Sequence, residues 1–326
     1  MIQAKSAGRL PENALQKKPI PRKTKRNLFV LAVLGPFAIW MLIYMLVPLV
    51  NVIIYSFTDA KMAYDDFSFV GLYQFQKMFT NSTAKIAIVN TVKAALIIMP
   101  ISLVLAMLAA LGLNALSDRF RGFYTFAYFL PNIMSMTAVC LVWRWLYHDQ
   151  YGIFNVILEW FGIGKQQFVK SSSQALASLC AIHIWTIFGY YAVILLSAMR
   201  GIDKSLYEAA DISGANAVAK FFYITLPMMK NQLLFVCIML TTSAFMFFTP
   251  AKVITNGTPG TSTMVMLLYI YQQGIERGDI AFSCATSLIL MLIILFFSLV
   301  QWVLSRERKP KPIPDYSNQK KGGEKK

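Results

Sequence analysis

The stretch "EAADISGANAVAKFFYITLP", residues Glu208 to Pro227, separates two long apolar segments and is itself polar and rich in alanine. Just before it, Ser205 forms an S-x-x-E pattern with Glu208. This spacing is typical of a capping box, in which the serine and glutamate side chains close the first turn of a helix. Gly214 can adopt the left-handed conformation that ends a helix. The pattern therefore predicts a short capped helix that ends at Gly214.

A second short helix is predicted after this turn. It carries Phe221 and Phe222, and Pro227 ends it because proline has no N–H to donate and crowds the preceding turn. The two short helices carry small residues that leave their surface smooth, namely Ala209, Ala210, Gly214 and Ala215. A simple linker needs no smooth surface, whereas a loop that seats in a groove of another protein does. We therefore interpret the stretch as a docking element.

Composition places the chain among integral membrane proteins. Of its 326 residues, 57% are apolar and 14% are charged, and the mean hydropathy is +0.54. A soluble domain normally carries about 25% charged residues. The net charge of +16 could indicate a nucleic-acid partner. However, the charge lies in tails and short loops and no basic patch is interleaved with aromatic residues, so we expect no nucleic-acid binding.

Six apolar runs predict an all-α integral membrane fold with six transmembrane helices. Each run reaches the length of about 20 residues that crosses a hydrocarbon layer. The runs are 28–57, 86–114, 122–147, 174–199, 231–254 and 281–304.

The distribution of basic residues predicts the orientation. Most of the 31 lysines and arginines lie in the two tails, 1–27 and 305–326, and in the loop 200–230. Basic residues concentrate on the cytoplasmic side of membrane proteins. We therefore expect both tails and the loop 200–230 to be cytoplasmic, flanking a membrane domain of residues 28–304 in the cell membrane.

Prolines inside the runs indicate kinked or broken helices; these are Pro36, Pro48, Pro100, Pro131 and Pro250. Breaks of this kind are tolerated where a helix faces protein or a wet cavity, which suits a transporter or channel better than an anchor. In the second run, small residues recur at four-residue spacing, at Ser102, Ala106 and Ala110. This stripe predicts a close helix–helix contact.

The loop also resembles a known signature. Glu208-Ala-Ala, three residues, Gly214, nine residues and Ile224-x-Leu226-Pro227 resemble the EAA loop of ABC importer permeases. Other stretches, including "YFLPNIMSMTAVCLVWRWLYHDQYGIFN", are similar to sugar-importer permeases of the maltose type, in the compact six-span form of the first subunit. One position departs from that pattern, because Ser213 stands where carbohydrate permeases usually have aspartate.

The resemblance implies a type I ABC importer permease whose cytoplasmic EAA helices dock on an ATPase. It implies a homologous second permease, two ATPase subunits that hold ATP and Mg, an external solute-binding protein, membrane lipid and a sugar substrate. The residues expected to couple to the ATPase are Glu208, Ala209, Ala210, Gly214, Ala215, Phe221, Phe222, Ile224, Leu226 and Pro227.

The sequence itself indicates no enzyme. The nearest match to a phosphate-binding GxxxxGK[ST] motif is Gly162-Ile-Gly164-Lys165, which lacks the first glycine and the final serine or threonine. No HExxH or GxSxG motif occurs. The four cysteines lie in apolar runs without CxxC spacing, which indicates packing rather than a metal site. We therefore expect no cofactor, metal or catalytic residue on this chain.

Ionisable groups within the runs are few. Lys93 and Arg144 lie toward outer ends of runs, where their charges can reach the headgroups. His183 lies deeper and is interpreted as a hydrogen-bonded core histidine. A secondary transporter would need a carboxylate near mid-membrane to bind a proton or Na⁺. None is present, which favours an external energy source.

A solute site is expected where aromatic and small polar residues meet at broken helices. Three stretches qualify: 132–136, 188–191 and 241–247. By resemblance to the maltose-type family, the cavity candidates are Asn132, Met136, Phe188, Gly189, Tyr190, Ser243 and Phe247. Phe247→Ala is expected to alter sugar uptake without loss of assembly.

These observations favour a permease subunit of an ATP-driven sugar or oligosaccharide importer. An ABC permease for a polyamine, glycerol phosphate or peptide is the first alternative. An anionic solute would need a basic cavity, and no lysine or arginine lies in the middle of a run to supply one. An ATPase-independent secondary transporter or channel is the second. A membrane anchor or scaffold is the third, and it leaves the EAA pattern unexplained.

Overall fold

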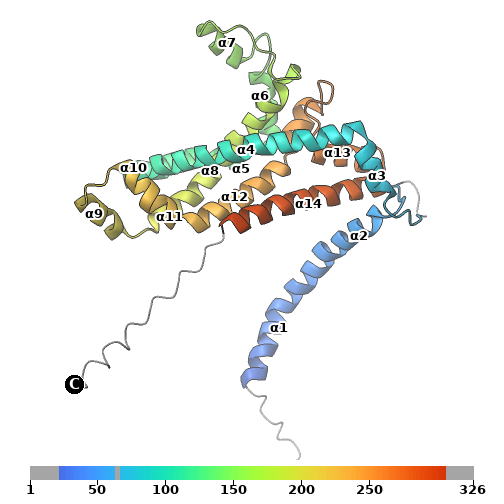
Figure 1. Ribbon diagram of the computed structural model, residues 1–326, viewed down its shortest axis with the longest axis horizontal. Helices are drawn as coiled ribbons and strands as arrows, with labels where there is room; N and C mark the ends of the chain where they lie inside the picture. The colour runs from blue at the N-terminus through green and yellow to red at the C-terminus, as the bar shows by residue number, and fades with distance from the viewer. Residues whose placement is uncertain (1–21, 63–66, 306–326) are drawn as a thin grey trace, which may run out of the picture. The chain divides into compact units, whose positions relative to one another are not determined.

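The computed structural model describes residues 22–62 and 67–305. The predicted tails 1–27 and 305–326 therefore lie mostly outside the described residues, although α1 begins at Arg22, inside the first of them. The chain divides into two compact units, residues 1–54 and 55–326. All regular elements of the described residues are helices (Figure 1), and an isolated antiparallel bridge pairs Thr58 with Phe69.

The first unit is one long apolar helix with a wide turn. It comprises α1 (Arg22–Met41), the π-helical turn η1 (Leu42–Leu46) and α2 (Val47–Ser56). In the wide turn the N–H of Val47 donates to the carbonyl of Leu42. Pro48 follows at once and has no N–H to continue the helical ladder. The wide turn thus accommodates the proline, and Phe29–Ser56 remains long and apolar enough to cross a membrane.

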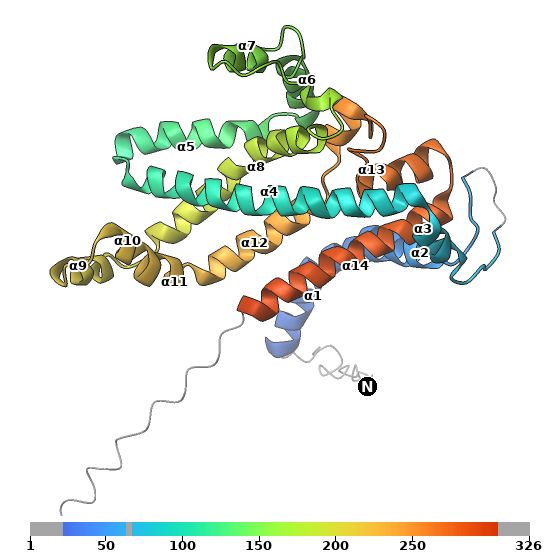
Figure 2. The ribbon, with the colours of Figure 1, turned by 45° about the horizontal axis from the view of Figure 1, so that its top comes forward.

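The core of the second unit lies between α4 (Ser82–Ala115), α8 (Ala175–Arg200) and α12 (Lys230–Phe245), with α14 (Ile280–Ser305) packed against α12 (Figures 1 and 2). The predicted stripe of Ser102, Ala106 and Ala110 is confirmed as a contact surface, because all three side chains are fully buried. Without bulky side chains, α4 can approach its neighbours closely.

Two of the predicted spans are broken. The run 122–147 was expected to be one span, but α5 (Asp118–Ile133) and α6 (Met136–Leu146) meet at an angle of 95°. The break lies at Met134, whose backbone is extended, and at Ser135, whose backbone is not helical. The run 231–254 ends as a helix at Phe245, and the π-helical turn η4 (Ala251–Thr255) follows Pro250. The breaks follow Pro131 and precede Pro250, whereas Pro36 and Pro100 lie inside the continuous helices α1 and α4 and break neither.

Among the described residues, four helices are long and apolar enough to cross a membrane, and the number of spans rises to six if each sharply bent pair counts as one. The shorter elements complete the second unit. These are α3 (Tyr73–Thr80), α7 (Ile153–Trp160), η2 (Phe168–Lys170), α9 (Lys204–Ile212), α10 (Ala217–Lys220), η3 (Phe221–Thr225), α11 (Leu226–Met228), α13 (Met266–Tyr271) and η5 (Gln272–Glu276). Helices α9 and α10 lie at one end of the bundle, and α3 and α13 lie at the other (Figure 1).

Helices α5 and α8 meet backbone to backbone at Gly189. A Cβ atom built on Gly189 would lie 1.8 Å from the carbonyl oxygen of Tyr128. Only glycine fits where two main chains approach this closely. The contact therefore fixes α5, and the pocket residues near its end, against α8.

Candidate coupling loop and solute pocket

The first helix of the predicted docking loop, α9 (Lys204–Ile212), is capped by Asp203 rather than by Ser205. The Asp203 carboxylate accepts a hydrogen bond of 2.9 Å from the backbone N–H of Ser205. This bond lowers the pKa of Asp203 below its ordinary value. The predicted capping box was wrong because Ser205 already lies inside the helix. The residue that caps a helix needs non-helical backbone angles, and Asp203 has them.

The end of α9 confirms the predicted role of Gly214. Its φ is 75°, in the left-handed region. The N–H of Gly214 donates to Asp211 (3.0 Å) and the N–H of Ala215 donates to Ala210 (2.9 Å). These two bonds form a Schellman motif, which satisfies carbonyl groups that the end of a helix leaves free.

The second helix continues farther than predicted. Asn216 caps α10 by accepting a 2.8 Å hydrogen bond from the N–H of Ala219. The π-helical turn η3 (Phe221–Thr225) follows, and α11 runs through Pro227 to Met228. Pro227 therefore does not end the helix, because the wide turn before it accommodates the missing N–H, as at Pro48. The helix then bends by 74° into α12.

Two side-chain contacts join the halves of the loop. Asp211 of α9 forms an ion pair with Lys220 of α10. The Tyr207 hydroxyl hydrogen-bonds the Thr225 hydroxyl at 2.9 Å, and Thr225 is buried. A helix as short as α9 is not stable alone in water. The caps and these contacts therefore hold α9 to α11 together as a helical hairpin.

The hairpin presents an exposed apolar surface. Neither α9 nor α10 contains a buried residue. Ile212 is 89% exposed and Tyr223 is 83% exposed, with Val218 and Phe222 also exposed. Sequence reasoning missed Ile212, Val218 and Tyr223. The sequence could have indicated these three residues, because they are large and apolar and lie in a loop that was expected to face water. Such a surface commonly marks a protein–protein contact.

The predicted coupling residues occupy the same hairpin in two states of burial. Five are exposed: Glu208, Ala209, Gly214, Phe222 and Pro227. Five are partly buried: Ala210, Ala215, Phe221, Ile224 and Leu226. The exposed five are available to a partner, whereas the others support the hairpin. Their part in coupling stays a prediction.

Gly214→Ala is expected to weaken the hairpin by about 1–2 kcal/mol, because an L-residue at this left-handed φ is strained. Crowding contributes nothing, since no atom lies within 4 Å of the added Cβ. Faster backbone hydrogen exchange of residues 204–220 would measure the loss. Gly201→Ala is the control, because Gly201 has a φ of −78° and its added Cβ makes only an ordinary contact. Equal exchange in both variants would contradict the expectation.

A pocket of about 230 Å³ lies where two helices break. The break between α5 and α6 contributes Asn132, Met134 and Met136, and the chain after α12 contributes 246 and 248–250. The wall from α8 consists of His183, Thr186 and Ile187. The pocket thus combines amide, imidazole and hydroxyl groups with apolar and aromatic side chains, a mixture suited to a small polar solute.

His183 is the polar centre of this region. Its Nε2 lies 3.1 Å from the Ser243 hydroxyl, which joins α8 to α12. The Phe247 ring meets the imidazole edge-on, with centroids 5.5 Å apart. The Nδ1 atom of His183 is buried and has no hydrogen-bond partner among the described residues. Sequence reasoning treated His183 as a hydrogen-bonded core residue; the hydrogen bond to Ser243 is present, but the residue is only partly buried and lies on the pocket wall.

The predicted cavity residues are only partly brought together. Asn132 and Met136 line the pocket, and Ser243 reaches it through His183. Phe188 contacts the ring of Tyr128, and Tyr190 contacts those of Phe129 and Tyr191. Gly189 serves the contact between α5 and α8 described above, and Phe247 lies elsewhere. Met246 also lines the pocket and lies in the predicted stretch 241–247, whereas sequence reasoning missed Thr186, Phe248 and Thr249.

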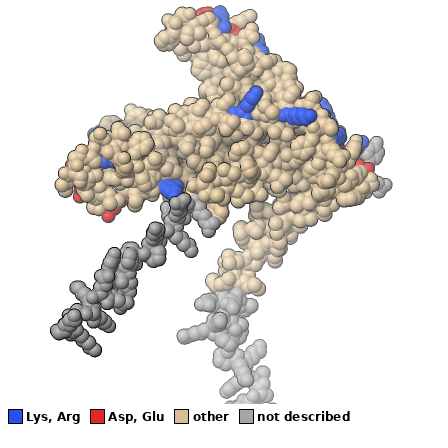
Figure 3. Space-filling model, in the orientation of Figure 1, with Lys and Arg blue, Asp and Glu red and all other residues tan. Residues whose placement is uncertain are grey.

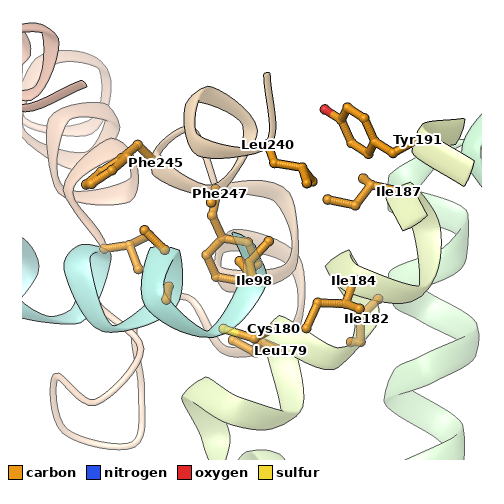
Figure 4. Packing of buried hydrophobic residues seen from close by; sticks show 14 of the residues in the cluster. Ile98, Leu179, Cys180, Ile182, Ile184, Ile187, Tyr191, Leu240, Phe245 and Phe247 are labelled. Atoms are coloured by element: carbon orange, nitrogen blue, oxygen red, sulfur yellow. The ribbon is translucent and has the colours of Figure 1, made fainter. Parts of the chain in front are cut away.

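Phe247 belongs to the hydrophobic core of the chain. Its side chain is 1% exposed, and Figure 4 shows it among the buried residues between the helices. Met246 and Phe248 line the pocket on either side of it in sequence. Helix α12 ends at Phe245 and the backbone turns at Met246, so the helical spacing of α12 does not extend to Phe247.

Phe247→Ala is accordingly expected to reduce assembly of the protein rather than to alter uptake alone. Emptying a buried phenylalanine site costs about 3–5 kcal/mol in well-packed cores. The yield of folded protein in detergent and its melting temperature measure the effect. Phe248→Ala is the matched control, because its side chain is only partly buried at the pocket. Normal yield with altered uptake in Phe247→Ala would restore the first expectation.

Comparisons with known proteins converge on one family. Residues 102–309 match the family described as "Binding-protein-dependent transport system inner membrane component". The chain is 31% identical over 274 residues to the arabinooligosaccharides transport system permease protein AraP of Halalkalibacterium halodurans, covering 83% of this chain and 86% of the relative. It is 28% identical to the diacetylchitobiose uptake system permease protein NgcF of Streptomyces coelicolor, over 93% of this chain and 90% of the relative.

A solved structure shares the fold. One chain of a bacterial ABC transporter involved in the import of the acidic polysaccharide alginate superposes with a TM-score of 0.77 at 22% identity. The match covers 89% of this chain and 99% of that chain. The all-helical arrangement described above is therefore a known transporter fold.

Proposed function

Because the chain belongs to the family of binding-protein-dependent transport system inner membrane components, we propose that it is the multi-pass permease subunit of an ATP-driven importer for an oligosaccharide. It forms part of the solute pathway and performs no covalent chemistry. The energy comes from ATP hydrolysis on a partner chain.

One observation carries the mechanism: of the two helices that flank the exposed hairpin, α8 walls the pocket and α12 leads directly into the wall segment that follows it. Helix α8 carries His183 and Thr186 and ends at Arg200, just before the cap of α9. Helix α12 begins after α11 and ends beside the pocket at Phe245. A displacement of the hairpin therefore moves both walls. ATP binding and hydrolysis by the partner would stabilise different positions of the hairpin, and so different openings of the pocket.

The assembly follows from this mechanism. A homologous second permease completes the pathway, two cytoplasmic ATPase subunits bind ATP and Mg, and an external binding protein delivers the solute. The hairpin at α9 then faces the cytoplasm, as do both tails, and the end with α3 and α13 faces outward. The permease domain is residues 28–304, the coupling loop is 200–230, and the flanking segments 1–27 and 305–326 are basic tails.

The solute class rests on two kinds of support. The relatives named above transport arabinooligosaccharides and diacetylchitobiose, and the matched structure belongs to a transporter for alginate. The pocket offers hydroxyl, amide and imidazole groups beside Phe248 and several methionines. Sugars present hydroxyl groups and apolar ring faces, so these residues suit them. His183, whose Nδ1 has no partner among the described residues, can bond a sugar hydroxyl.

Purification of the intact complex from its host tests the proposal. An ATPase should co-purify with the chain, and one saccharide should stimulate ATP hydrolysis several-fold when the binding protein is added. Solute uptake into vesicles without ATP would instead indicate a secondary transporter. Stimulation by a polyamine, glycerol phosphate or peptide, and by no saccharide, would retain the ABC permease and reject the sugar.

A further inference from the structure

Two hollows lie at the end of the bundle opposite α9, outside the pocket already described. The first, of about 550 Å³, combines the polar residues Asn90, Lys93, Ser172, Ser173 and Ser262 with the apolar residues Leu96, Ile97, Leu176 and Ala177. The second, of about 500 Å³, combines Arg144, His148, Lys170, Thr255 and Thr258 with Tyr147, Val169, Ile254 and Pro259.

The hollows share the same loops as walls. Lys170 lines one hollow and Ser172 lines the other, in one short turn before α8. Thr258 and Ser262 do the same in the loop after η4. Asn90 holds this loop to α4, because its Nδ2 donates to the carbonyls of Thr261 and Met264 at 2.9 and 3.0 Å. The two hollows therefore flank one fixed pair of loops.

Each hollow contains a cation without a carboxylate partner. Lys77, Lys170 and Lys252 of the same end are paired with Asp279, Asp149 and Glu276. Lys93 and Arg144 have no ion-pair partner among the described residues, and both side chains are exposed. In Figure 3, lysine and arginine side chains gather where the arm of α6 and α7 leaves the bundle.

Neither hollow has a carboxylate among its described lining residues, and the Asp149 carboxylate next to His148 is already paired. Asp149 accepts a 2.8 Å hydrogen bond from Lys170, and this bond lowers its pKa. It therefore stays ionised near neutral pH and balances Lys170. The charges of Lys93 and Arg144 remain uncompensated, so the two hollows together favour an anion.

The serine and threonine side chains of the two hollows favour an anion that itself carries many hydroxyl groups. Ser172, Ser173 and Thr258 are exposed beside the cations; the Ser173 hydroxyl bonds that of Ser171, and the Thr258 hydroxyl donates to the Thr255 carbonyl and can still accept a bond. The Ser262 hydroxyl is buried without a partner among the described residues. A protein surface docking here would meet two concave sites rather than a flat face. A lipid phosphate would match the cations but needs fewer hydroxyl groups than the hollows offer.

We propose that Lys93 and Arg144 form an outer receiving site for an acidic oligosaccharide, with Lys93 and Arg144 each taking a carboxylate and the serine and threonine side chains binding sugar hydroxyls. If the Lys93 and Arg144 side chains only extended to the lipid headgroups, their charges would be explained, but their position in hollows with serine and threonine side chains would not. The inference rests on the proposed function, since it names the class of solute that enters the pathway.

The test compares two probes on the purified complex in nanodiscs of uncharged, zwitterionic lipid, without the binding protein. The probes are a trisaccharide of galacturonic acid and the matching neutral trisaccharide of galactose. The wild type should bind the acidic probe more tightly. Lys93→Gln and Arg144→Gln should each lower that preference about tenfold, the effect of losing one charged hydrogen bond. Lys165→Gln is the control, because Lys165 pairs with Glu159 and lines neither hollow.

Four outcomes would overturn the inference. These are equal binding of the two probes by the wild type, an unchanged preference in the Lys93 and Arg144 variants, an equal loss for both probes, and an effect of Lys165→Gln as large as theirs. With any of these outcomes, the proposed function as a sugar importer is retained if a neutral saccharide still stimulates ATP hydrolysis by the full complex. Absence of stimulation by every saccharide would instead contradict the sugar importer itself.

Discussion

Ile212→Asp is expected to detach the ATPase from the membrane subunit and to abolish transport. Ile212 is 89% exposed at the end of α9, next to the turn at Gly214. If the hairpin docks in a groove, this side chain is the most protruding apolar anchor, and anchors of this kind contribute about 2 kcal/mol or more to binding. A carboxylate in an apolar groove adds a desolvation cost. Affinity should therefore fall at least about 30-fold.

Co-purification of the ATPase and solute-stimulated ATP hydrolysis measure this effect. Ile163→Asp is the matched control, because Ile163 is also an exposed isoleucine but lies in the loop after α7. Tyr223→Asp should reproduce the loss from the other side of the hairpin. Glu208→Lys should also uncouple hydrolysis from solute, as the EAA signature predicts. Full transport by Ile212→Asp would show that the ATPase does not dock on this surface.

The second large effect is expected for Gly189→Ala. The added methyl group would lie 1.8 Å from the carbonyl oxygen of Tyr128 and 2.5 Å from its carbonyl carbon. A backbone group cannot rotate away as a side chain can, so α5 must move from α8. Overpacking typically costs 1–3 kcal/mol, and a clash with the main chain should lie at the upper end, about 3 kcal/mol.

The displacement should also open the pocket, because α5 carries Asn132. Lower thermal stability of the purified complex and weaker solute stimulation are therefore expected together. Gly112→Ala is the control, since Gly112 lies in α4 with no atom within 4 Å of the added Cβ. There, alanine should be neutral or slightly stabilising, because it favours the helix. Equal melting temperatures of the two variants would show that α5 and α8 separate without cost.

Several features followed from the sequence because they depend on neighbouring residues only. Hydropathy indicated the membrane class and the apolar runs, since crossing a hydrocarbon layer sets a length. The turn at Gly214 followed because glycine alone adopts that conformation at little cost. The N-cap was harder. Asp203 and Ser205 both qualify chemically, and the place where α8 ends, with Ile202 buried after it, selects Asp203.

Tertiary structure decided the rest, because it depends on residues distant in sequence. The residues near Gly189 in sequence do not predict its contact with the Tyr128 carbonyl. Likewise, the residues near His183 do not predict its hydrogen bond to Ser243 or the pocket beside it. Phe247 illustrates the same limit: it enters the core because the chain leaves its helix at Met246. The sequence by itself determined that the protein is a helical membrane protein whose polar loop turns at Gly214, since the length of an apolar run and the backbone freedom of glycine are local properties. The resemblance of that loop to the EAA signature indicated the transporter. Which side chains meet around the pocket was decided only when α5, α8 and α12 packed together.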